Sequence, residues 1–206
     1  MKIIVSINEL LDEVINIKNN LDKKKMLFVS VAGLSRSGKS TLIAEIQQLL
    51  NEQSMISQVI ELDHWILPNE KRNLTMTVKD RYQYDQISKD ISILFDKGEI
   101  DIFPYEPLTR STSKKKIQIS IKDTQVIFFD GVIALDQPYI NSISALKIFI
   151  DINEEIRKTR FINFYKTKKL ADIDIQILYE KRMQDEVEFV RQSRNKADLI
   201  INSGII

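Results

Sequence analysis

The spacing Gly33-x-x-x-x-Gly38-Lys39-Ser40 brings together residue types that bind polyphosphate. Glycines allow the backbone to fold tightly with its N–H groups pointing inward, and the helix expected after the loop adds the positive end of its dipole. In such a loop the ammonium of Lys39 would reach the terminal phosphates, and the hydroxyl of Ser40 would bind Mg²⁺. The residues expected to bind the nucleotide are Gly33, Ser35, Arg36, Ser37, Gly38, Lys39, Ser40 and Thr41.

Two aspartates follow apolar runs that have the composition of buried strands. Asp130 ends the run at residues 125–130, and Asp63 comes directly after residues 55–62. The carboxyl ends of parallel strands meet at one edge of a sheet, so we expect both side chains near the phosphate loop. Asp130 would support Mg²⁺ together with Ser40, and Asp63 would accept the proton of an attacking hydroxyl as a general base. For each of them the alternative is an aspartate that only caps a turn.

Three further side chains near these positions allow a functional and a structural interpretation. Trp65 would either stack on a planar ligand or fill the core. His64 is the only histidine of the chain and is more typical of a packed side chain than of a ligand. Arg110 lies in a basic segment between two expected strands, where it would meet an anionic substrate or only keep a surface tip soluble.

A basic cluster lies on one expected helix and its carboxyl end. By itself it would be a solvated helix face. Behind a phosphate loop it also fits a lid whose charge closes over the transferring phosphoryl group and excludes water. Its members are Arg157, Arg160, Lys166, Lys168 and Lys169.

The elements that would position these residues alternate along the chain. Helical periodicity predicts helices at residues 40–50, 84–97, 154–169 and 174–193. Apolar runs predict five buried strands, at residues 26–32, 55–62, 125–130, 146–151 and 197–201. This order indicates an α/β fold with a mainly parallel five-stranded sheet and helices on both faces.

Two additions to this sheet are expected. Alternating apolar residues at 100–104 and 116–121 predict a projecting β-hairpin, so we place a hairpin insertion at about residues 100–121 and a helical lid at about 157–170. Ser6 and Glu9 have the spacing of a capping box. We therefore expect residues 1–25 to form an amphipathic helix that precedes, and packs on, a domain of residues 26–206.

The composition restricts the function classes. The chain has 206 residues, of which 43% are hydrophobic, and this fits one domain with a full core. Thirty basic and 29 acidic residues nearly cancel, which argues against a nucleic-acid or membrane partner. There is no cysteine, so disulfides and thiolate metal sites are excluded. We expect a cytoplasmic protein, and the sequence leaves assembly into a homo-oligomer open.

The order of these motifs resembles the uridine kinase and phosphoribulokinase group of P-loop kinases, from about residue 26 to residue 202. The loop matches that group's G-x-S-x-S-G-K-[ST]-T pattern, with Arg36 where glycine is usual. Further similar segments are Asp63-His64-Trp65-Ile66, Tyr84-Asp85, Pro104-Tyr105-Glu106, Phe129-Asp130-Gly131 and Lys196-Ala197-Asp198. The resemblance implies a P-loop NTPase fold.

The resemblance also implies an activity: transfer of the γ-phosphoryl group of ATP, with Mg²⁺, to a hydroxyl of a nucleoside-like small molecule. It implies catalytic roles for Asp63, Lys39 and Arg160, with Ser40 and Asp130 at the metal. The acceptor would be bound by Asp63, Trp65, Tyr84, Tyr105 and Arg110. The lid would be formed by Arg157, Arg160, Lys166 and Lys169.

The chain departs from that group at two places. No histidine follows Tyr105 in the hairpin, and Phe161 and Phe164 stand in the lid where arginines are usual. Two alternatives therefore stay open. One is a kinase for another metabolite hydroxyl, of the nicotinamide riboside or pantothenate type. The other is a nucleotide-binding regulatory module that has lost phosphotransfer.

Overall fold

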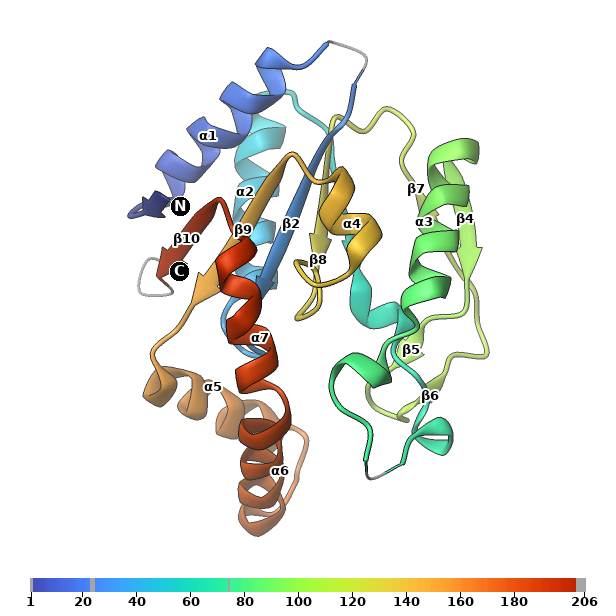
Figure 1. The fold of residues 1–206 in the computed structure, drawn as a ribbon, viewed down its shortest axis with the longest axis vertical. Helices are drawn as coiled ribbons and strands as arrows, with labels where there is room; N and C mark the ends of the chain where they lie inside the picture. Colours follow the sequence, from blue (N-terminus) through green and yellow to red (C-terminus); the bar gives the residue numbers. More distant parts are fainter. Residues whose placement is uncertain (1, 23–24, 74, 203–206) are drawn as a thin grey trace.

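The computed structural model describes residues 2–22, 25–73 and 75–202, and its centre is a six-stranded parallel sheet (Figure 1). The strand order is β1-β10-β9-β2-β8-β3, and every neighbouring pair is parallel. The strands are β1 (Lys2–Ile4), β2 (Leu27–Gly33), β3 (Ser57–Glu61), β8 (Val126–Asp130), β9 (Leu146–Asp151) and β10 (Leu199–Asn202). The α/β class with a parallel sheet is confirmed.

The predicted strand number was wrong by one. The additional strand, β1, pairs with β10 in the register Lys2↔Leu199 to Ile4↔Ile201. Three residues are too few to show a strand pattern in the sequence, and only Ile4 of the three is buried. The N-terminal segment therefore extends the sheet as well as providing a helix.

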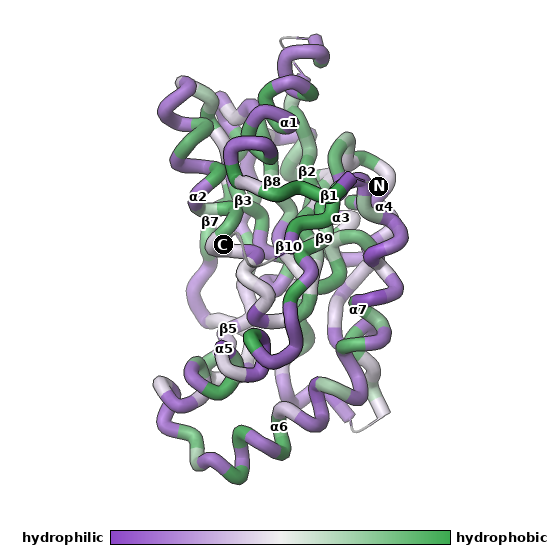
Figure 2. Tube along the Cα trace, turned by 90° about the vertical axis from the view of Figure 1, so that its left-hand side faces the viewer, coloured by the Kyte–Doolittle hydropathy of each residue, from purple (hydrophilic) through white to green (hydrophobic). Residues whose placement is uncertain are grey.

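Helices cover both faces of the sheet, because strands buried on both sides need an apolar layer over each. Val126 and Phe128 of β8 pack in one core, and Ile127 and Phe129 pack in the other. The first core is closed by α1 (Ile7–Asn20) and α2 (Lys39–Glu52), and the second by α3 (Tyr84–Lys97), α4 (Pro138–Ile143) and α7 (Val187–Ser193). Figure 2 shows hydrophobic residues concentrated in the strands, with hydrophilic stretches along the outer helices.

The N-terminal helix is part of this core. The hydroxyl of Ser6 accepts a 3.2 Å hydrogen bond from the backbone N–H of Glu9, so the predicted cap is present. Leu10 and Val14 of α1 are buried in the core that α2 also closes. Among the described residues, every helix is too short or too polar to span a bilayer.

The hairpin predicted for residues 100–121 is present. Strands β4 (Glu99–Ile102) and β7 (Ile117–Ser120) pair antiparallel, and a second short pair, β5 (Tyr105–Glu106) with β6 (Ser111–Thr112), continues it toward the tip. Helix α3 ends at Gly98, whose φ of 77° is the left-handed conformation that glycine adopts at helix ends. Figure 1 shows α3 beside β4 and β7 at the side of the sheet that carries β3 and β8.

The helix predicted for residues 174–193 is in fact two helices. Helix α6 (Asp172–Asp185) ends where α7 begins at Val187, and Glu186 lies between them. Helix α6 packs on α5 (Glu154–Thr167) through Phe161, Ile175 and Tyr179, away from the sheet, whereas α7 packs on the sheet. One straight helix cannot serve both surfaces, so the chain bends at Glu186. Helices α5 and α6 extend beyond the sheet edge in Figure 1.

Candidate active site

The phosphate loop lies between β2 and α2, and its backbone explains its residue types. A Cβ on Gly33 would lie 2.7 Å from the carbonyl oxygen of Ile150 and 2.9 Å from Oγ of Ser37, so only glycine fits. Gly38 has a φ of 101° and precedes the first residue of α2. Arg36 has a φ of 67°, a left-handed conformation at the position where the sequence resemblance leads us to expect glycine. A non-glycine residue there costs about 1 kcal/mol.

The ammonium of Lys39 is held inside the loop. Its Nζ donates 3.1 Å hydrogen bonds to the carbonyl oxygens of Gly33 and Leu34, and the side chain is buried. A cavity of about 450 Å³ opens beside it. The cavity is lined by Arg36, Gly38, Lys39, Ser40, Thr41, Arg160 and Phe164. Five of the predicted nucleotide-binding residues therefore face one cavity.

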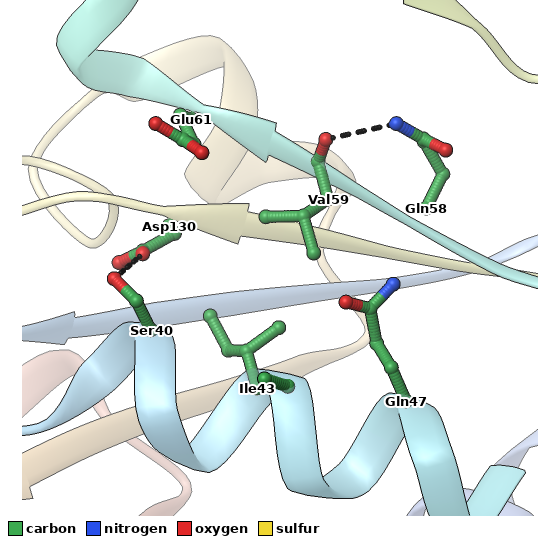
Figure 3. A pocket seen from close by; sticks show the side chains of 8 residues that line it. Ser40, Ile43, Gln47, Gln58, Val59, Glu61 and Asp130 are labelled. Carbon is green, nitrogen blue, oxygen red and sulfur yellow. Dashed lines mark hydrogen bonds between the residues drawn. The ribbon is translucent and has the colours of Figure 1, made fainter.

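Ser40 and Asp130 meet beside this loop. Oγ of Ser40 donates a 2.7 Å hydrogen bond to Oδ2 of Asp130, which ends β8 (Figure 3). Asp130 is only 7% exposed, and its Oδ1 has no hydrogen-bond partner among the described residues. Burial raises the pKa of Asp130, and the charge of Lys39 opposes this shift. The sequence-predicted metal pair is therefore brought together.

This pair fits Mg²⁺, which binds hydroxyl and carboxylate oxygens and keeps several waters. A buried carboxylate oxygen without a partner is costly, and a cation would satisfy it. Within the described ranges, no group of three or more His, Cys, Asp or Glu side chains is placed to hold a metal ion. The chain would therefore supply only part of the metal's ligands, and phosphate oxygens and water would supply the rest.

Asp63 comes two residues after Glu61, which is the register partner of Asp130 on the neighbouring strand. It sits in the short 3₁₀ turn Leu62–Trp65 that follows β3, and a Cβ on Gly131 would lie 2.9 Å from Cβ of Leu62. This close approach holds the ends of β3 and β8 together. Burial raises the pKa of Asp130, and the negative charge of Asp63 raises it further. Burial lowers the pKa of Arg36, and the Asp63 charge opposes part of this shift. Asp63 is therefore within electrostatic range of the loop.

Tyr82 is a residue of this site that the sequence did not indicate. Its hydroxyl donates a 2.7 Å hydrogen bond to Oδ1 of Asp63. Burial, followed by the Asp63 charge, raises the pKa of Tyr82 well above its ordinary value. The hydroxyl therefore stays protonated and acts as a donor. Tyr82 lies in an irregular segment before α3, where no spacing distinguishes it from its neighbours.

Two side chains of the lid helix α5, Arg160 and Phe164, contact the phosphate loop. Arg160 of α5 donates a 3.3 Å hydrogen bond from Nη1 to the carbonyl oxygen of Ser37. Phe164, one turn further, has its ring centroid 3.2 Å from Cζ of Arg36 and 4.4 Å from Nζ of Lys168. Cations over an aromatic face are attracted by its quadrupole. The lid therefore contacts the phosphate loop through one arginine and one phenylalanine.

Arg157 was predicted as a lid cation, and this is wrong. Its side chain is fully buried, and Nε donates a 2.8 Å hydrogen bond to Oε1 of Glu154. Its guanidinium also lies over the ring of Tyr179. Arg157 therefore joins α5 to α6. The two lysines of the predicted lid, Lys166 and Lys169, are not among the cavity-lining residues, and Lys166 pairs with Asp172 at 3.2 Å.

The predicted acceptor residues are only partly supported. Trp65 is 3% exposed, and its indole N–H donates a 2.7 Å hydrogen bond to Asp90, so it fills the core and the stacking interpretation is wrong. The Tyr84 hydroxyl donates to Oδ2 of Asp136 at 2.9 Å, and the ring packs against the core, so its placement at the acceptor is not supported. Burial lowers the pKa of His64, which keeps its ring neutral.

Tyr105 and Arg110 lie on the hairpin. The ring of Tyr105 in β5 has its centroid 5.0 Å from Cζ of Arg72, a residue that the sequence did not indicate. Arg110 lies between β5 and β6. The pKa of Lys168 is lowered mainly by burial, then by the charge of Arg36, and also by the charge of Arg110. The hairpin tip, the lid and the phosphate loop therefore approach one another closely enough for their charges to interact.

The ion pair between Glu186 and Arg182 contacts the backbone of the phosphate loop. Oε1 of Glu186 accepts a 2.8 Å hydrogen bond from the backbone N–H of Ser35, and Oε2 pairs with Arg182 at 2.8 Å. Glu186 is fully buried. Burial would raise the pKa of Glu186, but the Arg182 charge and the Ser35 N–H hold it below its ordinary value, so it is ionised. No local pattern indicates this contact, because 151 residues separate its partners.

Comparison with known proteins places this site in a family. The chain is 25% identical over 194 residues to a uridine kinase of Limosilactobacillus reuteri, covering 88% of this chain and 85% of the relative. It is 27% identical over 193 residues to a uridine kinase of Lactiplantibacillus plantarum, with 88% of each covered. The solved structure of a candidate fructose transport system kinase from Silicibacter sp. TM1040 has the same fold, with a TM-score of 0.75, 15% identity and coverage of 95% and 98%.

The family assignment rests on a match to a family model. The sequence model of the Phosphoribulokinase / Uridine kinase family covers residues 28–205, which include every site residue described above. The expectation from the sequence motifs is therefore confirmed, and the chain is a phosphotransferase that belongs to the phosphoribulokinase and uridine kinase family.

Proposed function

We propose that the protein transfers the γ-phosphoryl group of ATP to a hydroxyl of a nucleoside-like small molecule. One observation supports this most directly: Asp63 comes two residues after Glu61, the register partner of Asp130, and Asp130 is hydrogen-bonded to Ser40 of the phosphate loop. A base, a metal pair and a phosphate loop at one sheet edge are what in-line phosphoryl transfer requires.

Each residue has one task in this reaction. Lys39 binds the β- and γ-phosphates, and Ser40 and Asp130 hold Mg²⁺, which when bound neutralises charge on the phosphates. Asp63 accepts the proton of the acceptor hydroxyl as the hydroxyl oxygen attacks the γ-phosphorus, and the bond from that phosphorus to the bridging oxygen of the β-phosphate breaks to release ADP. Arg160 stabilises the negative charge of the moving phosphoryl group.

The lid has the additional task of keeping water out. The ring of Phe164 contacts the cations of Arg36 and Lys168, and it is an apolar wall of the phosphate cavity. Water that reached the γ-phosphate would compete with the acceptor, so an apolar lid surface favours transfer over hydrolysis.

The nucleoside part of the proposal is supported by the relatives, several of which are named uridine kinases. A panel of hydroxyl acceptors with labelled ATP tests it, and the panel includes uridine, cytidine, nicotinamide riboside and pantothenate. We expect transfer to a nucleoside. Transfer to another acceptor alone would replace the nucleoside class. Tight ATP binding without transfer to any acceptor would instead support a regulatory module.

Asp63→Ala tests the role of the base. We expect turnover to fall at least about 100-fold, because general-base contributions are of that order, while ATP affinity stays unchanged. Equal losses of turnover and ATP affinity would show that Asp63 has a structural role.

A further inference from the structure

A polar groove runs between α2 and the edge strand β3 (Figure 3). Its volume is about 370 Å³, and one end is formed by the hydrogen-bonded pair Ser40 and Asp130. The groove therefore opens directly beside the proposed metal pair. Its other lining residues are Ile43, Ala44, Gln47, Gln58, Val59 and Glu61.

Glu61 brings a second carboxylate to this end of the groove. Glu61 of β3 and Asp130 of β8 are register partners on neighbouring parallel strands, so their side chains point to the same face of the sheet. Figure 3 shows both of them on the groove side, near Ser40. Two negative charges on neighbouring side chains repel each other unless something compensates them.

The second observation is a buried carboxylate oxygen of Asp130 that lacks a hydrogen-bond partner among the described residues. This oxygen is Oδ1, and the residue is 7% exposed and lines the groove. The carboxylate of Glu61, the register partner of Asp130, lines the same groove. A cation between them would satisfy the buried oxygen and remove the repulsion.

We propose that Glu61 is a second carboxylate of the divalent-cation site and binds the water shell of the Mg²⁺ held by Ser40 and Asp130. Mg²⁺ dehydrates reluctantly and keeps several of its waters, which donate hydrogen bonds to nearby carboxylates. Carboxylates in this outer position change metal affinity by about 10- to 100-fold. The inference rests on the proposed function, because it names a further residue that positions the metal of that reaction.

A different explanation for Glu61 exists. Strand β3 is at the edge of the sheet, where charged side chains prevent pairing with another chain. Under this explanation Glu61 is only a solvated charge, and removing it leaves metal affinity unchanged. The experiment must therefore measure metal binding itself.

Electron paramagnetic resonance of Mn²⁺ makes this measurement without turnover. The full chain is titrated with Mn²⁺ in the presence of the non-hydrolysable ATP analogue AMP-PNP, and metal bound to the protein complex is read from the loss of the free Mn²⁺ signal beyond the loss in a protein-free mixture of Mn²⁺ and AMP-PNP. The variants are Glu61→Gln, Glu61→Asp and the control Glu52→Gln. Glu52 is an exposed glutamate at the far end of α2, so its substitution makes the same change in charge outside the groove.

We expect Glu61→Gln to weaken Mn²⁺ binding about 10-fold, Glu61→Asp to weaken it less, and Glu52→Gln to match the wild type. Equal affinity in the wild type and Glu61→Gln would overturn the inference and leave the proposed function intact. Equal weakening in Glu61→Gln and Glu52→Gln would also overturn it, because the effect would then be one of net charge. If the wild type bound no Mn²⁺ with AMP-PNP, the proposed function would fail and the inference with it.

Discussion

The hydroxyl of Tyr82 donates a 2.7 Å hydrogen bond to Oδ1 of Asp63, which ties the segment before α3 to the turn after β3. A donor on one carboxylate oxygen fixes the orientation of the group and leaves the other oxygen for an acceptor hydroxyl. The base in the proposed reaction is therefore positioned by a residue from a different part of the chain.

Tyr82→Phe should lower kcat about 10-fold and leave the KM for ATP unchanged, because it frees the Asp63 carboxylate to rotate without touching the phosphate loop. The pKa of Tyr82 is raised well above its ordinary value, so the hydroxyl stays a donor at high pH. The ratio of wild-type to variant kcat should therefore be constant from about pH 6 to about pH 9. Steady-state kinetics at several pH values checks both expectations, with Tyr139→Phe as the control.

Arg157 and Arg160 lie three residues apart on α5 but should respond differently to substitution. Arg157→Ala removes the buried partner of Glu154, so we expect a loss of about 2 to 3 kcal/mol in unfolding free energy, below the value for a fully buried pair since Glu154 is partly exposed. Arg160→Ala should lower kcat about 100-fold with little change in stability. Urea unfolding and kinetics of both variants separate the two. A drop in kcat without loss of stability in Arg157→Ala would restore its predicted lid role.

Those two arginines show what the sequence could predict and what it could not. The phosphate loop and the strand-end position of Asp130 follow from local patterns, since a glycine spacing or an apolar run is contained in a few consecutive residues. Whether Arg157 or Arg160 faces the phosphates depends on how α6 packs on α5, and no pattern within α5 records this. The two lid roles were therefore assigned together, and one was wrong.

Contacts between residues far apart in the sequence could not be predicted either, because no local pattern records them. Tyr82 and Asp63 are 19 residues apart, and Glu186 and Ser35 are 151 apart, without any regular spacing between the partners. Trp65 could be interpreted in two ways because core filling and ligand stacking use the same apolar ring. Only its buried bond to Asp90 decides between them.

Asp136 should make stability depend on pH. Burial would raise its pKa, but hydrogen bonds from Lys196 and Tyr84 hold the pKa below its ordinary value of 3.8. Because the folded-state pKa is the lower one, this stabilisation is complete above about pH 4 and is lost as the pH falls through the folded-state pKa. Asp136→Asn should cost about 1 kcal/mol at neutral pH after allowance for solvent screening, and the difference should decrease as the pH falls below about 4. Thermal unfolding at pH 7 and at about pH 3 measures it, and a constant difference would contradict the assignment.

The Glu186 and Arg182 pair couples the helix break to the phosphate loop. Glu186→Gln would remove the main counter-charge of Arg182, whose side chain is partly exposed, so we expect a loss of about 2 to 3 kcal/mol in unfolding free energy. The amide oxygen of glutamine still accepts from the Ser35 N–H, but more weakly than a carboxylate. We therefore expect the KM for ATP to rise, by about 3-fold.

A double variant separates the two effects. Glu186→Leu with Arg182→Met removes both charges, so most of the lost stability should return, since apolar side chains of similar size often replace a buried ion pair without cost. The Ser35 N–H then has no acceptor, and the KM for ATP should rise further, by about 10-fold. If the double variant recovered stability and the wild-type KM together, the contact between Glu186 and Ser35 would have no role in shaping the loop for phosphate.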